Sequence, residues 1–437
     1  MLNLTSQEIQ SMSGEVLCPG DKSISQRILI IGSFLNSDIE INGFLNADDP
    51  NSTLSALNQM GACIRKDQNK VFLTKRNIPF QEPSKDLDLG NSGTGVRLIL
   101  GLISGLGLKS KLVGDSSLSS RPMLRVIKPL KEMGAKIESE GTLPVHTSGS
   151  KILNDFTYDM PIASAQVKSC LLLAALASKN NITIFEPKIT RDHTERMIDY
   201  FGGDINFGQK ENIGKVEFKS NNLYSKSYYS VPGDFSSAAF IIVAALISRQ
   251  SEVLIKNVGL NKTRSGLLEI LKLMGADIDI HNQKTKFNEE VGDIIVKSSN
   301  LVGIEVPENI IPNIIDEIPI LSIAAAFADG TTKITNASEL RVKESDRLKA
   351  ISEGLSKLNI VHEIFDDGIE ITGTKEKIDS VDMINSFDDH RIAMSFLISG
   401  IRSKNGISVK NCKNIETSFP NFMNIMNSLG MKINEKN

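Results

Sequence analysis

A short pattern that recurs six times limits the folds open to this 437-residue chain. In each copy an amphipathic segment ends at Gly or Asn, as in LKEMGAKI, and a β-rich stretch follows. Gly or Asn is typical of the position just after a helix C-terminus, because both tolerate a positive φ. The six pivot residues, spaced by roughly 70 to 85 residues, are Gly61, Gly134, Gly202, Gly275, Asn359 and Gly430. This spacing predicts six copies of one supersecondary unit.

Each copy contains two further parts. A β-rich segment precedes each amphipathic helix, at 37–44, 110–115, 181–187, 252–258, 331–337 and 406–412. A second helix, apolar nearly all round, precedes each of those, at 25–35, 95–105, 165–177, 236–248, 317–328 and 390–399. A helix that is apolar on every face is buried. We therefore expect an α/β fold of six units, with these helices inside and the sheets and amphipathic helices outside.

The length predicts two domains of about 200 residues each, because 437 residues exceed the size at which a single hydrophobic core stops growing. Six units then divide three and three. We expect one domain to comprise 20–232 and the other to comprise 1–19 with 233–437, so that the chain crosses between them twice. We expect the active site in the cleft between the domains.

Composition excludes several classes of function. The net charge of −3 argues against nucleic acid or membrane as a partner. Four scattered cysteines and five scattered histidines show no metal-ligand spacing, so we expect no metal and no cofactor. The first residues lack a signal-peptide pattern, and the longest apolar stretches are about ten residues, too short to span a bilayer. We expect a soluble, cytoplasmic monomer.

Polar motifs stand at the starts of the six apolar helices, at 19–27, 90–97, 164–168, 232–237, 314–319 and 388–391. A helix N-terminus offers free N–H groups and a partial positive charge, and Gly and Ser allow close approach of an anion. Several such N-termini facing one cleft predict an anion-binding site in a protein of negative net charge.

Each motif alone has an ordinary explanation. Segment 90–97 is rich in Gly but is neither a dinucleotide-binding motif nor a P-loop. Segment 341–347, RVKESDR, has the alternating charges of a solvated face. Arg121 could be solvated, and a structural network of ion pairs explains His193 and His390 as well as catalysis does.

Taken in chain order, however, eleven segments resemble the motif set of the 5-enolpyruvylshikimate-3-phosphate synthases. They span residues from about 19 to 420 and are PGDKSISQR, GNSGTGVRL, SSRPM, SAQVKS, RDHTERM, VPGDFSSAAF, NKTRSG, IIDEIPIL, RVKESDR, DDHRIAM and TSFPNF. Four of them also resemble the class II branch, which tends to tolerate the inhibitor glyphosate. The resemblance implies an inside-out α/β barrel, the enolpyruvyl transferase fold, with three βαββαβ repeats in each of two domains.

The resemblance also implies transfer of the enolpyruvyl group of phosphoenolpyruvate to the 5-hydroxyl of shikimate 3-phosphate, in chorismate biosynthesis. The implied shikimate 3-phosphate ligands are Lys22, Ser23, Arg27, Ser164, Ala165, Gln166, Arg191, Asp316 and Lys343. The implied phosphoenolpyruvate ligands are Lys22, Gly93, Thr94, Arg121, Gln166, Arg347 and Arg391. Asp316, Glu344 and Lys22 are the implied catalytic residues, with the acid and base labels of Asp316 and Glu344 open to exchange.

The chain departs from the family pattern in three places. Gln26 stands where His is usual, and we expect little effect. Ser418 stands where many members have a phosphoenolpyruvate-binding Lys, so one cationic contact is missing or comes from elsewhere. Glu339 and Leu340 replace Asn and Trp, so no role is carried onto Glu339.

Two rival functions share these features. The UDP-N-acetylglucosamine enolpyruvyl transferases have the same fold and donor, but they carry Lys-Asn where this chain has Lys22 and Ser23. They also carry a loop Cys that is absent from 115–120. The other rival is a homologue that binds a phosphorylated metabolite without turnover. The presence of four residues argues against it: Asp316, Lys343, Glu344 and Arg391.

Overall fold

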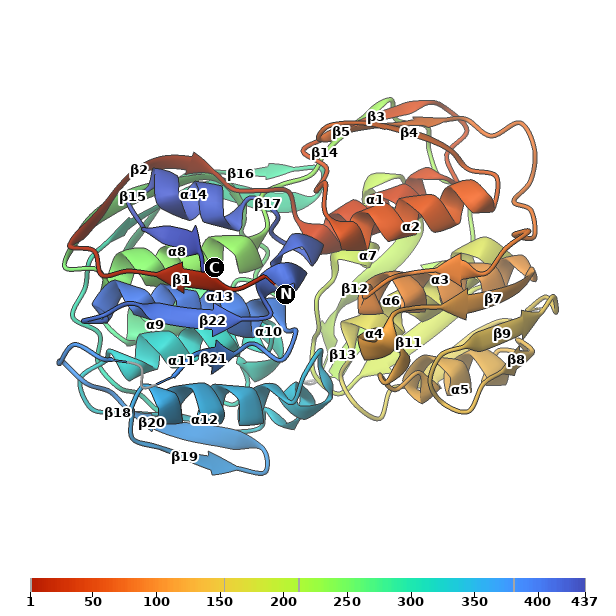
Figure 1. Cartoon of the computed structure of the whole chain (residues 1–437). Helices are drawn as coiled ribbons and strands as arrows, with labels where there is room; N and C mark the ends of the chain where they lie inside the picture. Colours follow the sequence, from red (N-terminus) through yellow and green to blue (C-terminus); the bar gives the residue numbers. More distant parts are fainter. Residues whose placement is uncertain (1, 153, 211–212, 380–381, 437) are drawn as a thin grey trace. The chain divides into compact units, whose positions relative to one another are not determined.

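The computed structural model describes residues 2–152, 154–210, 213–379 and 382–436. The chain forms two compact units (Figure 1). Unit 1 comprises Met1–Pro19, Pro232–Lys284 and Glu290–Asn437, and unit 2 comprises Gly20–Val231 and Thr285–Glu289.

Unit 2 has three buried helices, α1 (Lys22–Gly32), α3 (Gly93–Leu106) and α6 (Ala165–Ser178). Its other helices are α2 (Asp48–Gln59), α4 (Ser116–Ser119), α5 (Leu124–Glu132) and α7 (His193–Tyr200). Its strands are β3 (Ile39–Asn42), β4 (Cys63–Asp67), β5 (Lys70–Thr74), β6 (Leu87–Asp88), β7 (Lys109–Val113), β8 (Ile137–Glu138), β9 (Val145–Ser148), β10 (Phe156–Asp159), β11 (Ile182–Glu186), β12 (Asp204–Lys210), β13 (Ile213–Lys219) and β14 (Tyr228–Ser230).

Unit 1 repeats the plan with buried helices α8 (Phe235–Ile247), α11 (Ile318–Ala326) and α13 (His390–Ser399). Its other helices are α9 (Gly266–Leu273), α10 (Ile311–Ile314), α12 (Arg347–Lys357) and α14 (Phe422–Ser428), with 3₁₀ turns at Ser338–Val342, Gly400–Arg402 and Cys412–Thr417. Its strands are β1 (Leu4–Ser6), β2 (Ser11–Leu17), β15 (Gln250–Gly259), β16 (Asp277–Lys286), β17 (Glu289–Lys297), β18 (Thr331–Ile334), β19 (His362–Phe365), β20 (Gly368–Thr372), β21 (Ile384–Asn385), β22 (Ile407–Lys410) and β23 (Ile433–Glu435).

The described strands form six small sheets, five with four strands and one with three. In unit 2 the orders are β14-β3-β5-β4, β6-β7-β9-β8 and β10-β11-β13-β12. In unit 1 they are β2-β15-β17-β16, β21-β22-β1-β23 and the three-stranded β18-β20-β19. In the five four-stranded sheets the first pair is parallel and the others are antiparallel. In the three-stranded sheet, parallel bridges from Val302 and Glu305 stand where the first strand would lie.

All six pivot residues are confirmed as helix stops. Each lies one residue beyond the C-cap of α2, α5, α7, α9, α12 or α14, and each has a φ between 55° and 107°. The prediction of six repeats, each with one buried and one amphipathic helix, is therefore confirmed.

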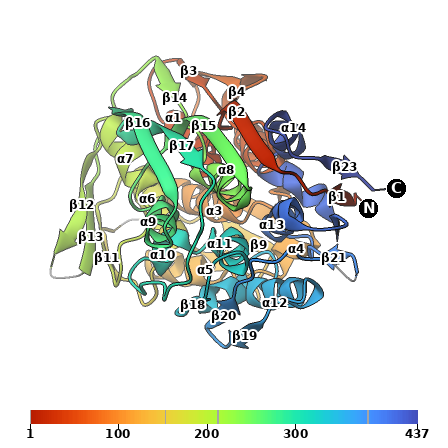
Figure 2. The ribbon, with the colours of Figure 1, turned by 90° about the vertical axis from the view of Figure 1, so that its left-hand side faces the viewer.

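The buried helices form the centre of each unit. In unit 1, α8 packs on α11 and α13, and Figure 2 shows the sheet of β2, β15, β17 and β16 over α8. In unit 2, α3 packs so closely on α6 that a Cβ at Gly101 would lie 2.2 Å from the carbonyl oxygen of Cys170. Glycine allows this approach of two backbones.

The chain path differs in two details from the sequence-based boundaries. Pro232 groups with unit 1 rather than unit 2. Thr285–Glu289, the tip of the β16–β17 hairpin, groups with unit 2, although 233–437 was assigned entirely to the other domain. The chain therefore passes between the groups four times, after Pro19, Val231, Lys284 and Glu289, and not twice.

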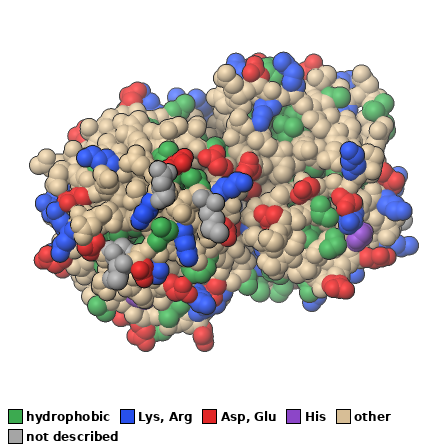
Figure 3. Space-filling view, in the orientation of Figure 1, with side chains coloured by type: hydrophobic (Ala, Val, Ile, Leu, Met, Phe, Trp, Pro, Cys, Tyr) green, Lys and Arg blue, Asp and Glu red, His purple; other side chains and the backbone are tan. Residues whose placement is uncertain are grey.

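Among the described helices, none has the length and apolarity needed to cross a membrane. On the face drawn in Figure 3, grey residues aside, Lys and Arg side chains are interspersed with Asp and Glu side chains.

Candidate active site

The buried helices of unit 2 each begin with a side-chain cap, as their polar motifs predict. Asp21 accepts a hydrogen bond from the backbone N–H of Ile24 at 2.8 Å, and Ser92 accepts one from Gly95 at 3.0 Å. Ser164, at 3.4 Å, caps α6 in the same way. These caps leave the remaining N–H groups of each first turn as potential donors to an anion.

Side chains connect the first turns of these three helices. Gln26 Nε2 donates to Ser92 Oγ at 2.6 Å, which joins α1 to α3. Gln166 Nε2 donates to Thr94 Oγ1 at 3.0 Å, which joins α6 to α3. Gln26 is fully buried, so the departure from the usual His fills an internal position. The N-termini of α1, α3 and α6 thus converge within unit 2.

Five cations gather around these N-termini, and we call them the cationic half-site: Lys22, Arg27, Arg97, Arg121 and Arg191. Lys22 Nζ lies 2.9 Å from Asp49 Oδ2, on the first turn of α2. The sequence offered no sign of Asp49, because it lies 27 residues away in another element.

Arg27 lies deep in the cationic half-site and is 3% exposed. Its Nε donates to Thr194 Oγ1 at 2.8 Å and its Nη2 to Ser169 Oγ at 2.9 Å. Burial lowers the pKa of Arg27 to about 10, and the neighbouring charge of Arg191 acts in the same direction. Two guanidinium groups so close together favour an anion nearby.

Gly93 opens α3 beside two arginines. A Cβ at Gly93 would lie 2.7 Å from Arg121 Nη1 and 3.2 Å from Arg97 Nη1. Arg97 Nη1 in turn donates to Gln166 Oε1 at 2.7 Å. The sequence reasoning named Gly93, Arg121 and Gln166 but missed Arg97, which closes the same quoted motif.

A buried ion pair connects two other quoted motifs. Lys168, from SAQVK, lies 2.8 Å from Glu195, from RDHTE, and 2.8 Å from Glu186. The side chains of these three residues are at most 3% exposed. The carboxylates outweigh the effect of burial and raise the pKa of Lys168 above its ordinary value, so the ammonium stays charged.

The buried helices of unit 1 also have connected N-termini. Arg391, on the first turn of α13, donates to the carbonyl oxygen of Asp316 at 2.7 Å. It also donates to Ser236 Oγ of α8 at 3.1 Å and to Glu317 Oε1 at 3.3 Å. Asp389 caps α13 by accepting from the backbone N–H of Arg391 at 2.9 Å.

Arg347 is the centre of what we call the carboxylate half-site, which comprises Asp316, Glu344 and Asp389 with this guanidinium. Its Nη1 donates to Asp316 Oδ1 at 3.2 Å, its Nη2 to Glu344 Oε2 at 2.6 Å and its Nε to Asp389 Oδ2 at 2.8 Å. Burial lowers the pKa of Arg347, but the three carboxylates have the larger combined effect and raise the pKa above its ordinary value. The guanidinium is a permanent cation.

The solvated-face interpretation of 341–347 is wrong for Arg347, which is 1% exposed. Arg341 and its ion-pair partner Asp346 are about one-third exposed. Lys343 Nζ lies 3.6 Å from Asp316 Oδ1. Arg264, which the sequence reasoning quoted in NKTRSG without a role, lies 3.8 Å from Asp316 Oδ2.

Ser418 is 7% exposed and follows the 3₁₀ turn Cys412–Thr417. His193 is buried and pairs with Glu289, as the ion-pair alternative proposed. In the described ranges, no group of three or more His, Cys, Asp or Glu side chains is arranged to hold a metal ion.

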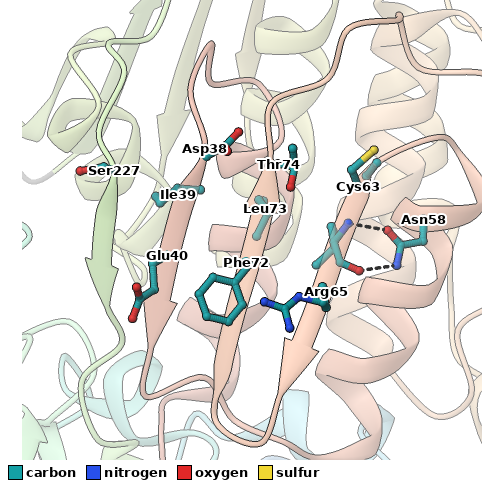
Figure 4. Close-up of a pocket in the computed structure, with 12 residues that line it drawn as sticks. Asp38, Ile39, Glu40, Asn58, Cys63, Arg65, Phe72, Leu73, Thr74 and Ser227 are labelled. Atoms are coloured by element: carbon teal, nitrogen blue, oxygen red, sulfur yellow. Dashed lines mark hydrogen bonds between the residues drawn. The ribbon is translucent and has the colours of Figure 1, made fainter.

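A hollow of about 720 Å³ lies elsewhere, over the sheet of β14, β3, β5 and β4 (Figure 4). Phe72 and Arg65 line it, and the Arg65 guanidinium stands 4.7 Å from the Phe72 ring centre. None of its lining residues is a candidate ligand or catalytic residue.

Known proteins resemble this chain over its whole length. A family model for EPSP synthase (3-phosphoshikimate 1-carboxyvinyltransferase) matches residues 6–426. A 3-phosphoshikimate 1-carboxyvinyltransferase of Petrotoga mobilis is 46% identical over 425 residues, which are 96% of this chain and 98% of that protein. One from Legionella pneumophila strain Lens is 43% identical over 438 residues, which cover 100% of both chains. A solved EPSP synthase of Acinetobacter baumannii superposes over 100% of both chains with a TM-score of 0.87 and 39% identity.

Proposed function

The chain belongs to the EPSP synthase (3-phosphoshikimate 1-carboxyvinyltransferase) family, and from that premise we propose how its two half-sites divide the reaction. The activity is transfer of the enolpyruvyl group of phosphoenolpyruvate to shikimate 3-phosphate with release of phosphate, in aromatic amino acid biosynthesis.

The reaction needs an acid, a base and dense positive charge. Carbon 3 of phosphoenolpyruvate must gain a proton as the 5-hydroxyl of shikimate 3-phosphate adds to carbon 2. The resulting tetrahedral phospho-adduct then loses a proton from carbon 3 and eliminates phosphate, which restores the carbon–carbon double bond. Groups that deliver and remove protons, and cations around two phosphates and a carboxylate, supply what this chemistry requires.

The carboxylate half-site supplies the proton-transfer groups. The observation that carries this proposal is that one guanidinium, that of Arg347, binds both Asp316 and Glu344. The two candidate groups are thereby held beside each other on a rigid fork. Glu344 delivers the proton to carbon 3 and Asp316 removes the proton of the 5-hydroxyl, or the two exchange these roles.

Arg347 binds phosphoenolpyruvate when the carboxylate of the substrate replaces the carboxylate of Glu344. Its donors to Asp316 and Asp389 stay in place, while the carboxylate of phosphoenolpyruvate takes the place of Glu344 on Nη2. A guanidinium binds either carboxylate through the same fork geometry. The exchange releases Glu344 for proton transfer at the moment the substrate arrives. Arg391 adds a second cation for phosphoenolpyruvate, and Lys343 a cation for shikimate 3-phosphate.

The cationic half-site holds the phosphorylated groups. Convergent N-termini of α1, α3 and α6 support this assignment, since each adds a partial positive charge to five full ones. The residues that bind shikimate 3-phosphate here are Ser23, Arg27, Ser164, Ala165, Gln166 and Arg191. The residues that bind phosphoenolpyruvate here are Gly93, Thr94, Arg121 and Gln166. Lys22 serves both substrates and assists the leaving phosphate.

A class II-like character is a further part of the proposal. The buried pair of Lys168 and Glu195 gives two of the class II-like motifs one shared structural role. Tolerance of glyphosate follows from the resemblance, while Gly93 leaves room for the inhibitor. We expect intermediate sensitivity.

At the level of the whole protein, we propose two domains, each of which carries one half-site, in a cytoplasmic monomer. The four cysteines are all free thiols, as a reducing compartment requires. Light scattering on the purified protein tests the monomer.

Release of phosphate from phosphoenolpyruvate tests the function. We expect release with shikimate 3-phosphate, none without it, and none with UDP-N-acetylglucosamine in its place. The rate should be unchanged by a metal chelator. Release with UDP-N-acetylglucosamine alone, or binding of both substrates without release, would establish one of the two rival functions instead.

A further inference from the structure

The tip of the β16–β17 hairpin has an unusual conformation for its sequence. Strands β16 and β17 are joined by the two residues Phe287 and Asn288, with φ of 53° and 61°. A two-residue loop with two positive φ values is the turn that normally carries Asn-Gly, and a bulky residue in its first position is uncommon. Contacts elsewhere must therefore stabilise Phe287 in this turn.

Those contacts are all within unit 2. The Phe287 ring lies 5.0 Å from the ring of Tyr229 and 5.5 Å from that of Tyr200. The carbonyl oxygen of Asn288 accepts from Arg196 Nη1 at 2.9 Å, and its side chain donates to Asp199 at 2.8 Å. The tip thus contacts Arg196, Asp199 and Tyr200 of helix α7.

The next tip residue, Glu289, forms a buried ion pair. Its Oε1 lies 2.7 Å from His193 Nδ1, and the two side chains are 4% and 2% exposed. Burial lowers the pKa of His193, but Glu289 and Asp21 raise it by more than burial and Arg27 lower it. The balance of these effects favours the imidazolium form of His193.

This ion pair lies next to the ligands assigned to shikimate 3-phosphate. His193 opens α7, and Arg191 precedes it by two residues. Thr194, the next residue, accepts a hydrogen bond from Arg27 Nε at 2.8 Å. Arg196, which contacts the tip, also holds Asp192 at 2.9 Å. The tip thus contacts the first turn of α7, which Arg191 precedes in the chain and to which Arg27 is hydrogen-bonded through Thr194.

We propose that Glu289 is a positioning residue for shikimate 3-phosphate, acting through His193 to fix the first turn of α7 and with it Arg27 and Arg191. The inference rests on the proposed assignment of these two arginines to that substrate. Glu289 lies 98 positions after Arg191 and 262 positions after Arg27, in a hairpin whose strands largely group with the other unit.

Glu289→Gln tests the proposal, because it removes the charge and keeps the shape. We expect the KM and the calorimetric Kd for shikimate 3-phosphate to rise about tenfold, since small misplacements of binding groups are costly. The KM for phosphoenolpyruvate and kcat at saturation should stay within about twofold. Glu289→Asp should recover part of the lost affinity. Glu290→Gln, the same change on the adjoining residue, is the matched control and should behave as wild type.

Two further variants separate the possible failures. In a His193→Asn background, Glu289→Gln should not raise the Kd for shikimate 3-phosphate any further, because the two residues act as a unit. If Arg191→Lys leaves shikimate 3-phosphate binding intact, the ligand assignment itself is wrong. If Arg191→Lys weakens binding and Glu289→Gln does not, Glu289 has no positioning role. A Glu289→Gln protein that loses thermal stability and affinity for both substrates alike would show a general structural role and overturn the proposal.

Discussion

Arg347 shows how one side chain can organise several others. It lies within hydrogen-bonding distance of Asp316, Glu344 and Asp389 and is almost fully buried. A neutral residue in its place would leave these three carboxylates without their shared cation. Its position therefore determines where the candidate acid and base lie.

Removal of either candidate proton-transfer group should abolish most turnover. We expect Asp316→Ala and Glu344→Ala each to lower kcat by at least about a hundredfold, the usual size of an acid–base contribution. Substrate affinities should change much less. Glu339→Ala, on the same segment and without an assigned role, is the control. Near-normal turnover in either variant would remove that residue from the mechanism.

Gly93 should discriminate between phosphoenolpyruvate and glyphosate. A methyl group there meets the Arg121 guanidinium at 2.7 Å, so that side chain must shift. We expect Gly93→Ala to raise the inhibition constant for glyphosate more than the KM for phosphoenolpyruvate, because the inhibitor is the longer molecule. An added methyl in a tight pocket costs about 1–3 kcal/mol. Titrations of both ligands on both proteins measure this, and equal changes would show that Gly93 does not discriminate.

At the scale of the secondary-structure elements, two kinds of contact hold the helices of unit 2 together. Backbone approach joins α3 to α6 at Gly101 and Gly105, where an added Cβ would lie 2.2 Å from a carbonyl oxygen in either case. Buried ion pairs join α7 to its neighbours through Glu195 and His193.

Gly101→Ala should therefore destabilise unit 2. The new methyl group must push α3 away from α6, and overpacking of this kind typically costs about 1–3 kcal/mol. Denaturant unfolding measures the change. Gly208→Ala, in strand β12 where nothing lies within 4 Å of the new atom, is the control and should stay near wild type. Equal stability of the two variants would mean that the helices can separate freely.

The His193–Glu289 pair should make stability depend on pH. Since the folded pKa of His193 is raised, its contribution is complete below the unfolded pKa of about 6.5 and is lost as pH rises through the folded pKa. Wild type should thus exceed His193→Asn in unfolding free energy by more at pH 6 than at pH 9. His146→Asn, at an exposed histidine outside this ion pair, is the matched substitution. A difference that grows toward high pH would contradict the protonated pair.

At the scale of the whole molecule, the two units contribute different chemistry. The cationic half-site of unit 2 is suited to phosphates, while the carboxylate half-site of unit 1 is suited to proton transfer. A chain that passes four times between the units connects them. The reaction needs both sets of groups.

Binding of the two substrates should consequently be coupled. Lys22 and Gln166 are assigned to both ligands, so we expect phosphoenolpyruvate to bind at least about fivefold more tightly once shikimate 3-phosphate is present, a usual size for such coupling. Calorimetry with and without the first substrate measures the ratio, and shikimate lacking the phosphate is the control. Equal affinities would argue against shared ligands.

The sequence by itself determined the architecture and the places where the chemistry starts. Helix stops such as Gly61 and Asn359, and caps such as Asp21 and Ser164, act on backbone groups within a few residues. Local signals of this kind repeat visibly along a chain. The six-repeat α/β fold could therefore be predicted from these signals, whereas the candidate ligands were predicted from the resemblance of the motifs to a known family.

Only the tertiary structure decided which charged groups meet. Lys22 pairs with Asp49, Lys168 with Glu195, and His193 with Glu289, which is 96 positions away. Such pairs depend on how separate elements pack, and no local spacing encodes them. The hairpin tip is the clearest case, because it groups with unit 2 through the ring contacts of the partly buried Phe287 and the buried ion pair of Glu289. Burial free energy is a property of the packed molecule, so these contacts could be found only there.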